Sequence, residues 1–412
     1  MKKIISLIVA ILMVVAMFAA CAAEEGEQSS SSPSGSEETV AGPFDDVEPL
    51  DEEVTINIAS LSGMAYGVIP YLIDELGGFE KANISFDGVG QVYGNGATLI
   101  EASNSWDVAT TGLGGMIGGT TSKNCILNSL TVRDEGCTFF WAQKDSAIAQ
   151  AGISNLGGTK EMYGTAAEWK GQEIYYPKGT TAHYVLATAL NIMGLTLEDV
   201  KSTQMDVTSV NTAMRAGTCE VGCIWGSLAF VPDMKELFVP VIGAMDVGCP
   251  LPAGMYWNST FYKEHYDAVI KFIELYFRAV DWVYENEDNA KYLLDVWDDW
   301  NSENSVNVTA QVNAQYLIDP DSRYYSLKEN YDYFKETTTA SDGTEMSGFE
   351  NLTYEPLKFL VSVGSYQEGT LSAFLDNKCN GDAIKYVYEN LFQGKDTYKT
   401  GISWLEDWEY EE

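Results

Sequence analysis

The sequence has few histidines and few basic residues. It contains two His, His183 and His265, and 24 Lys and Arg against 60 Asp and Glu, which gives a formal net charge of −36. Nucleic acid is therefore not expected as a partner, because its phosphates require basic side chains. The chain also has no Cys-x-x-Cys pair and no Gly-x-Ser-x-Gly motif, which argues against a zinc site and a serine hydrolase. We expect no metal, no cofactor and no catalytic residues.

Basic residues are absent from residues 22–53, where Ser, Gly, Pro, Asp and Glu predominate. Such a composition cannot bury enough apolar surface to fold. We therefore predict that residues 21–53 form a disordered tether.

The first residues have the pattern of a lipoprotein signal. Lys2 and Lys3 precede an apolar run over 4–17, and Phe18-Ala19-Ala20-Cys21 follows as a small-residue cleavage site. The run is short for a membrane span. We predict a signal peptide over residues 1–20, lipidation of Cys21, and a lipid anchor in the bacterial cell membrane that leaves the protein extracytoplasmic.

Six cysteines remain once Cys21 is assigned to lipid, and this even number allows up to three disulfides outside the cytosol. Cys219 and Cys223 lie on one predicted strand, where four residues span about 13 Å, too far for a disulfide. The pairing of the others is open. The six are Cys125, Cys137, Cys219, Cys223, Cys249 and Cys379.

The stretch from Trp169 to Trp225 predicts two strand–helix units. Apolar alternation ends at Pro177, and a Gly-containing turn leads to Thr180, which is placed to cap a helix that Gly194 ends. A strand that feeds such a turn leaves backbone N–H groups pointing beyond its carboxyl end. These groups form a seat for an anion or a polar ligand. The alternative is that Thr180 only caps the helix.

This stretch resembles the substrate-binding proteins of ABC importers for nitrate, taurine and aliphatic sulfonates. The resemblance is looser but continuous over most of residues 54–300. Two departures stand out: Gly226-Ser227 after the tryptophan, and an insertion over 159–167. The matching residues are Trp169-Lys170-Gly171, Lys178 to His183, Gly194-Leu195, Asp199-Val200, Ala216-Gly217, Glu220 and Ile224-Trp225.

The resemblance implies an α/β, two-lobed periplasmic-binding-protein type II (clamshell) fold with mixed, mainly parallel sheets and an added C-terminal helical region. We expect lobe one over 54–142, lobe two over 143–250, and a return to lobe one with C-terminal helices over 251–412. The chain is expected to cross between lobes near Ala142–Lys144 and near Val247–Ala253.

Ligands of parallel α/β sheets lie beyond the carboxyl ends of strands. The predicted ligand-binding residues follow such ends, although loops there are also polar simply in order to turn. They are Ser62, Met64, Tyr66, Asn95, Thr110, Thr111 and Gly112 in lobe one, and Thr180, Thr181, His183 and Trp225 in lobe two.

The resemblance implies a monomeric solute receptor that delivers a small organic solute (sulfonate-, taurine- or nitrate-like) to a membrane permease and its ATPase. An anion would be held locally by helix N-termini and Lys178, while the acidic composition favours a zwitterion or cation. The alternative ligands are a pyrimidine or thiamine precursor and an amino-acid-like solute. Pyrimidine-precursor synthases share the fold but carry a cysteine run that is absent here.

Overall fold

The computed structural model describes residues 42–86, 90–156, 161–376 and 378–397. The predicted signal peptide, Cys21 and the tether up to residue 41 lie outside these residues. The described residues belong to one compact unit that begins at Gly42. Within them, no helix combines the length and the apolar character needed to cross a membrane.

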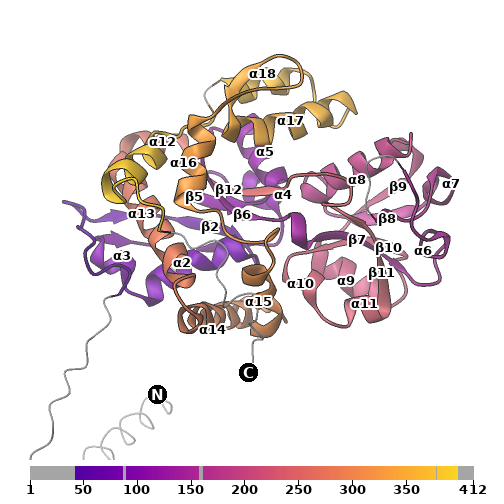
Figure 1. The fold of residues 1–412 in the computed structure, drawn as a ribbon, viewed down its shortest axis with the longest axis horizontal. Helices are drawn as coiled ribbons and strands as arrows, with labels where there is room; N and C mark the ends of the chain where they lie inside the picture. The colour runs from indigo at the N-terminus through magenta and orange to yellow at the C-terminus, as the bar shows by residue number, and fades with distance from the viewer. Residues whose placement is uncertain (1–41, 87–89, 157–160, 377, 398–412) are drawn as a thin grey trace, which may run out of the picture. The chain divides into compact units, whose positions relative to one another are not determined.

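Two five-stranded sheets organise this unit (Figure 1). The first sheet has the order β4-β2-β5-β12-β6, and the second has the order β11-β7-β10-β8-β9. The strands of the first are β4 Gln91–Tyr93, β2 Ile58–Leu61, β5 Val108–Thr111, β12 Pro252–Asn258 and β6 Cys125–Arg133. The strands of the second are β11 Phe238–Gly243, β7 Thr138–Gln143, β10 Val221–Trp225, β8 Glu173–Tyr176 and β9 Lys201–Gln204.

Each sheet is mixed. In the first, β2 pairs in parallel with β4 and β5, and β12 is antiparallel to β5 and β6. In the second, β8 is parallel to β9 and β10, and β7 is antiparallel to β10 and β11. The predicted mixed α/β class is confirmed, but half of these pairings are parallel rather than the expected majority. Two small sheets pair β1 Val54–Thr55 with β3 Ile84–Ser85, and β13 Thr337–Thr339 with β14 Glu345–Ser347.

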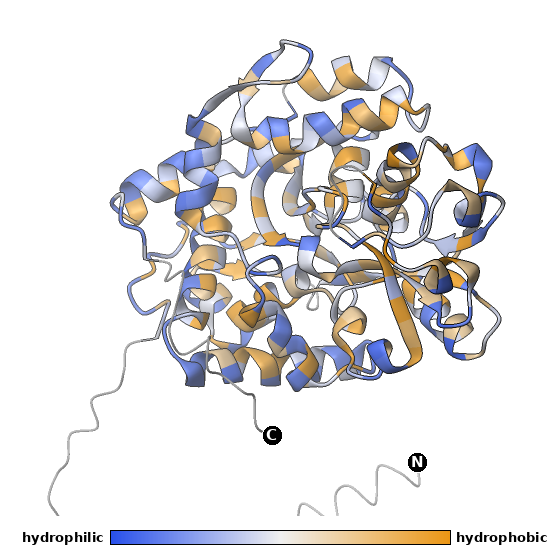
Figure 2. Cartoon of the chain, turned by 45° about the vertical axis from the view of Figure 1, so that its right-hand side comes forward, coloured by the Kyte–Doolittle hydropathy of each residue, from blue (hydrophilic) through white to orange (hydrophobic). Residues whose placement is uncertain are grey.

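Helices surround the sheets, and many of these helices carry hydrophobic as well as hydrophilic residues (Figure 2). Their bounds are α2 Ala65–Glu75, α3 Gly78–Lys81, α4 Gly96–Glu101, α5 Leu113–Ser122, α6 Ala147–Ala151, α7 Ala166–Trp169, α8 Thr181–Ile192, α9 Val207–Arg215, α10 Ser227–Phe230, α11 Met234–Leu237, α12 Ser259–Glu264, α13 Tyr266–Val283, α14 Glu287–Glu303, α15 Ala310–Ile318, α16 Leu327–Lys335, α17 Gly348–Ser362, α18 Gly369–Leu375 and α19 Asp382–Tyr386. Short 3-10 turns cover Glu135–Cys137 and Leu197–Asp199, and a π-helical turn covers Val387–Leu391.

The chain passes from the first sheet to the second through residues 134–137, between β6 and β7. The predicted first crossing near Ala142–Lys144 is therefore wrong, because Thr138–Gln143 is a strand that pairs with β10 and β11 of the second sheet. The return lies between β11 and β12, at residues 244–251. The Asp134 N–H donates to the Leu251 carbonyl over 2.9 Å, so the two crossings lie side by side.

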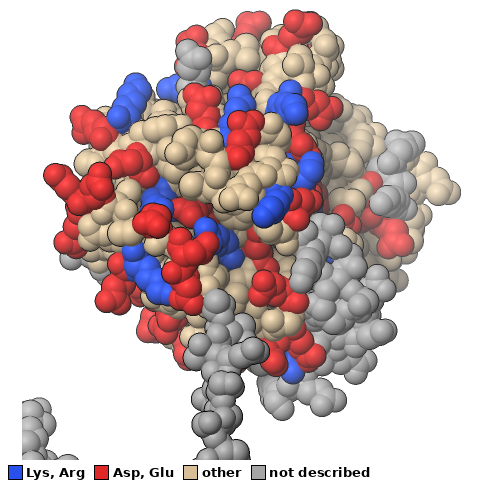
Figure 3. Space-filling model, turned by 60° about the vertical axis from the view of Figure 1, so that its left-hand side comes forward, with Lys and Arg blue, Asp and Glu red and all other residues tan. Residues whose placement is uncertain are grey.

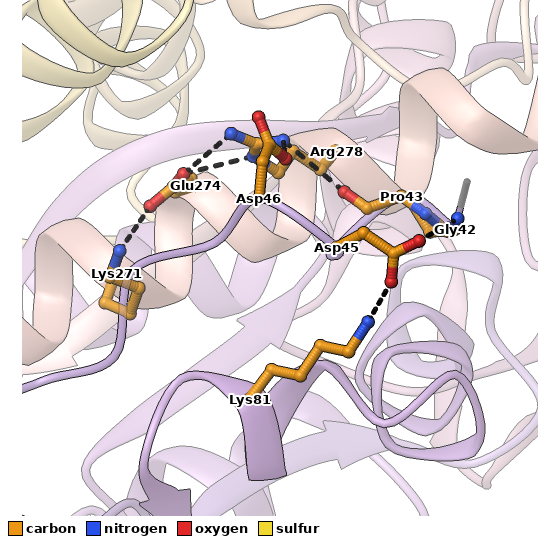
Figure 4. A network of polar contacts seen from close by, with 8 residues as sticks. All are labelled: Gly42, Pro43, Asp45, Asp46, Lys81, Lys271, Glu274 and Arg278. Carbon is orange, nitrogen blue, oxygen red and sulfur yellow. Dashed lines mark hydrogen bonds and ion pairs between the residues drawn. The ribbon is translucent and has the colours of Figure 1, made fainter.

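Residues 42–53 pack on the body, although the sequence predicts a tether as far as residue 53. Phe44 is 1% exposed and contributes to the hydrophobic core of the first sheet. Asp45 pairs with Lys81, and Asp46 pairs with Arg278 of α13 over 2.7 Å (Figure 4). Asp45 and Asp46 thus have basic partners on the body, and composition within the segment does not reveal these partners.

The C-terminal helices contact helices that belong to both sheets. Helix α17 contacts α5, which follows β5 of the first sheet, and α8, which follows β8 of the second. The six cysteines among the described residues are all unpaired thiols, so none of the disulfides allowed by their number is present there.

Candidate functional site

A small pocket lies where the two sheets present the carboxyl ends of their strands. Leu61, Thr111 and Trp225 end strands β2, β5 and β10, and Thr180 follows β8. The lining residues are Leu61, Met64, Tyr66, Gly96, Thr111, Gly112, Gly114, Gly115, Asp134, Thr180, Thr181 and Trp225.

Three helices that begin at the pocket have no side-chain cap. The N-cap residues of α2, α5 and α8 are Met64, Gly112 and Thr180, and none of them has a side chain that accepts a hydrogen bond from the first turn. The Thr180 hydroxyl instead donates to the Pro177 carbonyl over 2.6 Å. Helices such as α9 and α16, by contrast, are capped by Asp206 and Ser326. The helix starts at the pocket therefore retain N–H groups and positive partial charge for a polar ligand.

Glycines allow the two halves of the pocket to meet. A Cβ on Gly114 of α5 would lie 2.4 Å from the Thr180 Cα. A Cβ on Gly226, directly after Trp225, would lie 2.8 Å from the Met64 Sδ, and its φ of +66° also favours glycine. Gly226 is one of the two departures from the family pattern, and the approach of β10 to Met64 accounts for it.

The pocket wall at the crossing between the sheets is acidic. Asp134 is 3% exposed, and burial raises its pKa well above the ordinary range, with the neighbouring Glu135 adding to the shift. Its Oδ1 lies 3.9 Å from the Cys137 Sγ, a weak donor. Among the residues that line the pocket there is no Lys, Arg or His.

Seven of the eleven predicted ligand-binding residues line this pocket. They come from both sheets, and the structure brings them together from segments far apart in sequence. They are Met64, Tyr66, Thr111, Gly112, Thr180, Thr181 and Trp225. That they bind a ligand stays a prediction.

Four predicted residues lie outside the lining and have local roles. Asn95 caps α4 by accepting from the Thr98 N–H over 3.0 Å. The buried Thr110 hydroxyl donates to the Ser60 Oγ over 3.2 Å, while the Ser62 N–H donates to the Tyr93 carbonyl. His183 lies beside the pocket, where its Nε2 is 2.9 Å from the Ser365 Oγ and burial lowers its pKa.

Five lining residues were missed from the sequence. Gly96 belongs to an Asn-Gly pair that predicts a helix start or a hairpin, Gly114 and Gly115 follow a predicted buried strand, and Leu61 falls in a predicted loop. Asp134 follows an apolar run within the sequence Arg-Asp-Glu, and no ligand-binding role was predicted for it. Its position at the carboxyl end of a long buried strand was the signal available.

Comparison with known proteins supports the fold. No family model matches the chain. The chain is 25% identical over 236 residues to a protein of Brucella abortus named only as a binding protein; the match covers 56% of this chain and 61% of the relative. The chain thus spans about three-fifths of the length of these relatives.

Solved structures of periplasmic proteins share the architecture. The nitrate-binding protein NrtA from Synechocystis PCC 6803 aligns with a TM-score of 0.59 at 11% identity, over 85% of this chain and 92% of that one. The aliphatic sulphonate-binding protein SsuA from Escherichia coli aligns with a TM-score of 0.53 at 14% identity, over 77% and 91%. An enzyme, DszB, also shares the fold, with a TM-score of 0.52 at 12% identity over 81% and 98%.

The chain therefore has the periplasmic-binding-protein fold, and the predicted resemblance to the sulfonate- and nitrate-binding proteins is confirmed at the level of the fold.

Proposed function

We propose that this protein is the extracytoplasmic solute-binding component of an ABC importer. It captures a small organic solute in the pocket between the two sheets and delivers it to a membrane permease and its ATPase. Cys21 carries the lipid that holds it at the cell membrane.

The meeting of the two sheets at one pocket is the observation that carries this proposal. Uncapped helix starts face the pocket from both sides, and the chain crosses between the sheets at two adjacent segments. Two crossings of this kind allow one half to rotate against the other, so that a solute is enclosed between them.

The composition of the pocket favours binding over catalysis. The Cys137 thiol is buried beside Asp134, and burial raises its pKa well above the ordinary value, so it is a poor nucleophile. His183 bonds to Ser365 outside the pocket, and no other histidine lines it. A nucleophile paired with a base is therefore missing from the lining residues.

A substitution at the contact between the two halves tests the proposal. Gly114→Ala places a methyl group against the Thr180 backbone, so the halves no longer meet and solute binding is lost while the fold persists. Gly369→Ala is the matched control, because nothing lies within 4 Å of its Cβ.

The readout is the melting temperature in the presence of sulfonates, nitrate, pyrimidines and amino acids, since a ligand of the folded state raises it. We expect a shift with the parent protein and with the Gly369 variant, but not with the Gly114 variant. The absence of any shift across the panel would contradict the proposal.

A further inference from the structure

Asp134 is a buried acid that faces the pocket without a cation. Asp134 is 3% exposed, and it lines the pocket. Among the described residues, the only hydrogen bond to its carboxyl group comes from the Cys137 thiol, over 3.9 Å. A buried carboxylate normally has a charged or strongly hydrogen-bonding partner.

The nearest basic residue in sequence is directed elsewhere. The Arg133 guanidinium pairs with Glu329 over 2.5 Å and lies 4.0 Å from the centre of the Tyr325 ring. Lys178, the basic residue expected to help hold an anion, is exposed and does not line the pocket. None of the residues that the structure describes therefore supplies a positive side chain to the Asp134 wall.

Space next to the carboxyl group depends on a glycine. A Cβ on Gly112 would lie 2.9 Å from the Asp134 Oδ2 and 3.4 Å from the Thr181 Cγ2. The absence of this atom leaves Oδ2 accessible from the pocket. Because Gly112 is the N-cap residue of α5, the start of this helix, with its uncapped N–H groups, lies opposite the acid.

We propose that Asp134 binds an amino group of the solute, and that the solute is a small molecule with both an amino and an anionic group. The anionic group binds the free N–H groups at the starts of α5 and α8, and the ammonium group pairs with Asp134. This inference rests on the proposed function. It narrows the solute to aminated sulfonates or carboxylates, because a purely anionic solute would face Asp134 without a partner for it.

The pairing predicts a direction for proton exchange. Burial raises the pKa of the Asp134 carboxyl group, whereas an ammonium ion binds its ionised form, so binding favours proton release and strengthens as the pH rises. Four other groups face Asp134. They are Tyr66 from α2, Tyr316 from α15, and Glu135 and Cys137 from the turn that follows Asp134 itself. Asp319 lies close to Gly136 in the same crossing. Among these, Glu135 also has a pKa raised by burial, so it requires its own control.

The test uses pairs of probes that differ only in the amino group: taurine with ethanesulfonate, 3-aminopropanesulfonate with propanesulfonate, and β-alanine with propionate. Affinities are measured by calorimetry in two buffers of different ionisation enthalpy. For at least one pair we expect the aminated member to bind about 10- to 100-fold more tightly, with proton release. Asp134→Asn removes the difference, and Glu135→Gln, outside the pocket lining, preserves it.

Each outcome decides the proposal. Equal binding of both members of every pair that binds would overturn the inference and leave the proposed function standing. The same holds for tighter binding of the aminated probe that persists in the Asp134 variant. Binding by none of the probes would overturn the inference, while a melting shift with another solute in the wider panel would still support the proposed function. If the Asp134 variant does not fold, the pH dependence of the parent protein decides: affinity that falls as the pH rises contradicts the ion pair.

Discussion

Glu274 on α13 and Asp134 at the pocket are equally buried, each 3% exposed, yet their surroundings differ. Glu274 pairs with Lys271 over 2.7 Å and with Arg278 over 3.0 Å, and Arg278 also bonds to Asp46 and the Pro43 carbonyl (Figure 4). Asp134 has a thiol contact and no basic partner among the described residues. Among the described residues, basic side chains therefore pair with Glu274, whereas none pairs with Asp134.

Burial alone therefore does not identify a functional acid in this protein. On the face in Figure 3, acidic and basic side chains are interspersed. The acidic side chains that have basic neighbours there are ordinary surface charges. Asp134, a buried acid without a basic partner among the described residues, lies in the pocket, where a solute can supply a cation. Neutralising Glu274 should reduce stability and preserve binding, whereas neutralising Asp134 should weaken binding and leave stability nearly unchanged.

The largest effect on stability is expected from Glu274→Gln. This substitution leaves Lys271, which is 9% exposed, without its carboxylate partner, and we expect a loss of about 3 kcal/mol in the free energy of unfolding. Urea unfolding measures it. Lys328→Met, which breaks an exposed pair with Asp332, is the control and should cost less than about 1 kcal/mol. Equal losses in the two variants would refute the comparison.

Asp281 is an intermediate case on the same helix. Burial raises its pKa from 3.8 to about 7, and Thr397 donates to its Oδ2 while Oδ1 has no partner. Between these pH values the folded state binds more protons than the unfolded state, so stability falls as the pH rises from about 4 to about 7. We expect Asp281→Asn to flatten this slope, by up to about 2 kcal/mol, in unfolding curves across that range. Asp295→Asn, at an exposed site on α14, should leave the slope unchanged.

The smallest effect is expected at Asp46, the exposed end of the Glu274 network. Its side chain is 79% exposed, so Asp46→Asn should change the free energy of unfolding by less than about 0.5 kcal/mol. A loss as large as that of Glu274→Gln, measured in the same urea titration, would mean that Asp46 holds Arg278 in place.

The sequence was a good guide wherever neighbouring residues decide the structure. The strand, turn and helix from Glu173 to Ile192 form as predicted, with Thr180 at the N-cap position and Gly194 past the end at a φ of +73°. Hydrophobic periodicity and turn residues act over a few positions, so they can be interpreted without tertiary contacts. Apolar and polar residues alternate from Val54 to Ala59, which predicts one strand, but the structure has two there, β1 and β2.

Features that depend on distant contacts were predicted less well. The crossing at residues 134–137 was placed too late, because the pairing of β7 with β10 and β11 cannot be deduced from Thr138–Gln143 itself. The same error concealed Asp134, since a turn within one lobe gives no reason to expect an acid in a pocket. Asn95 and Thr110 satisfied the strand-end rule, but local hydrogen bonds occupy their side chains.

The decisive experiment measures taurine binding and melting temperature side by side for Asp134→Asn and Glu274→Gln. We predict that the Asp134 variant keeps its melting temperature within a few degrees and binds at least about 10-fold more weakly. The Glu274 variant should melt at a lower temperature and bind taurine as the parent protein does. Unchanged affinity in the Asp134 variant, with taurine bound by the parent protein, would contradict the claim that this acid is completed by the solute.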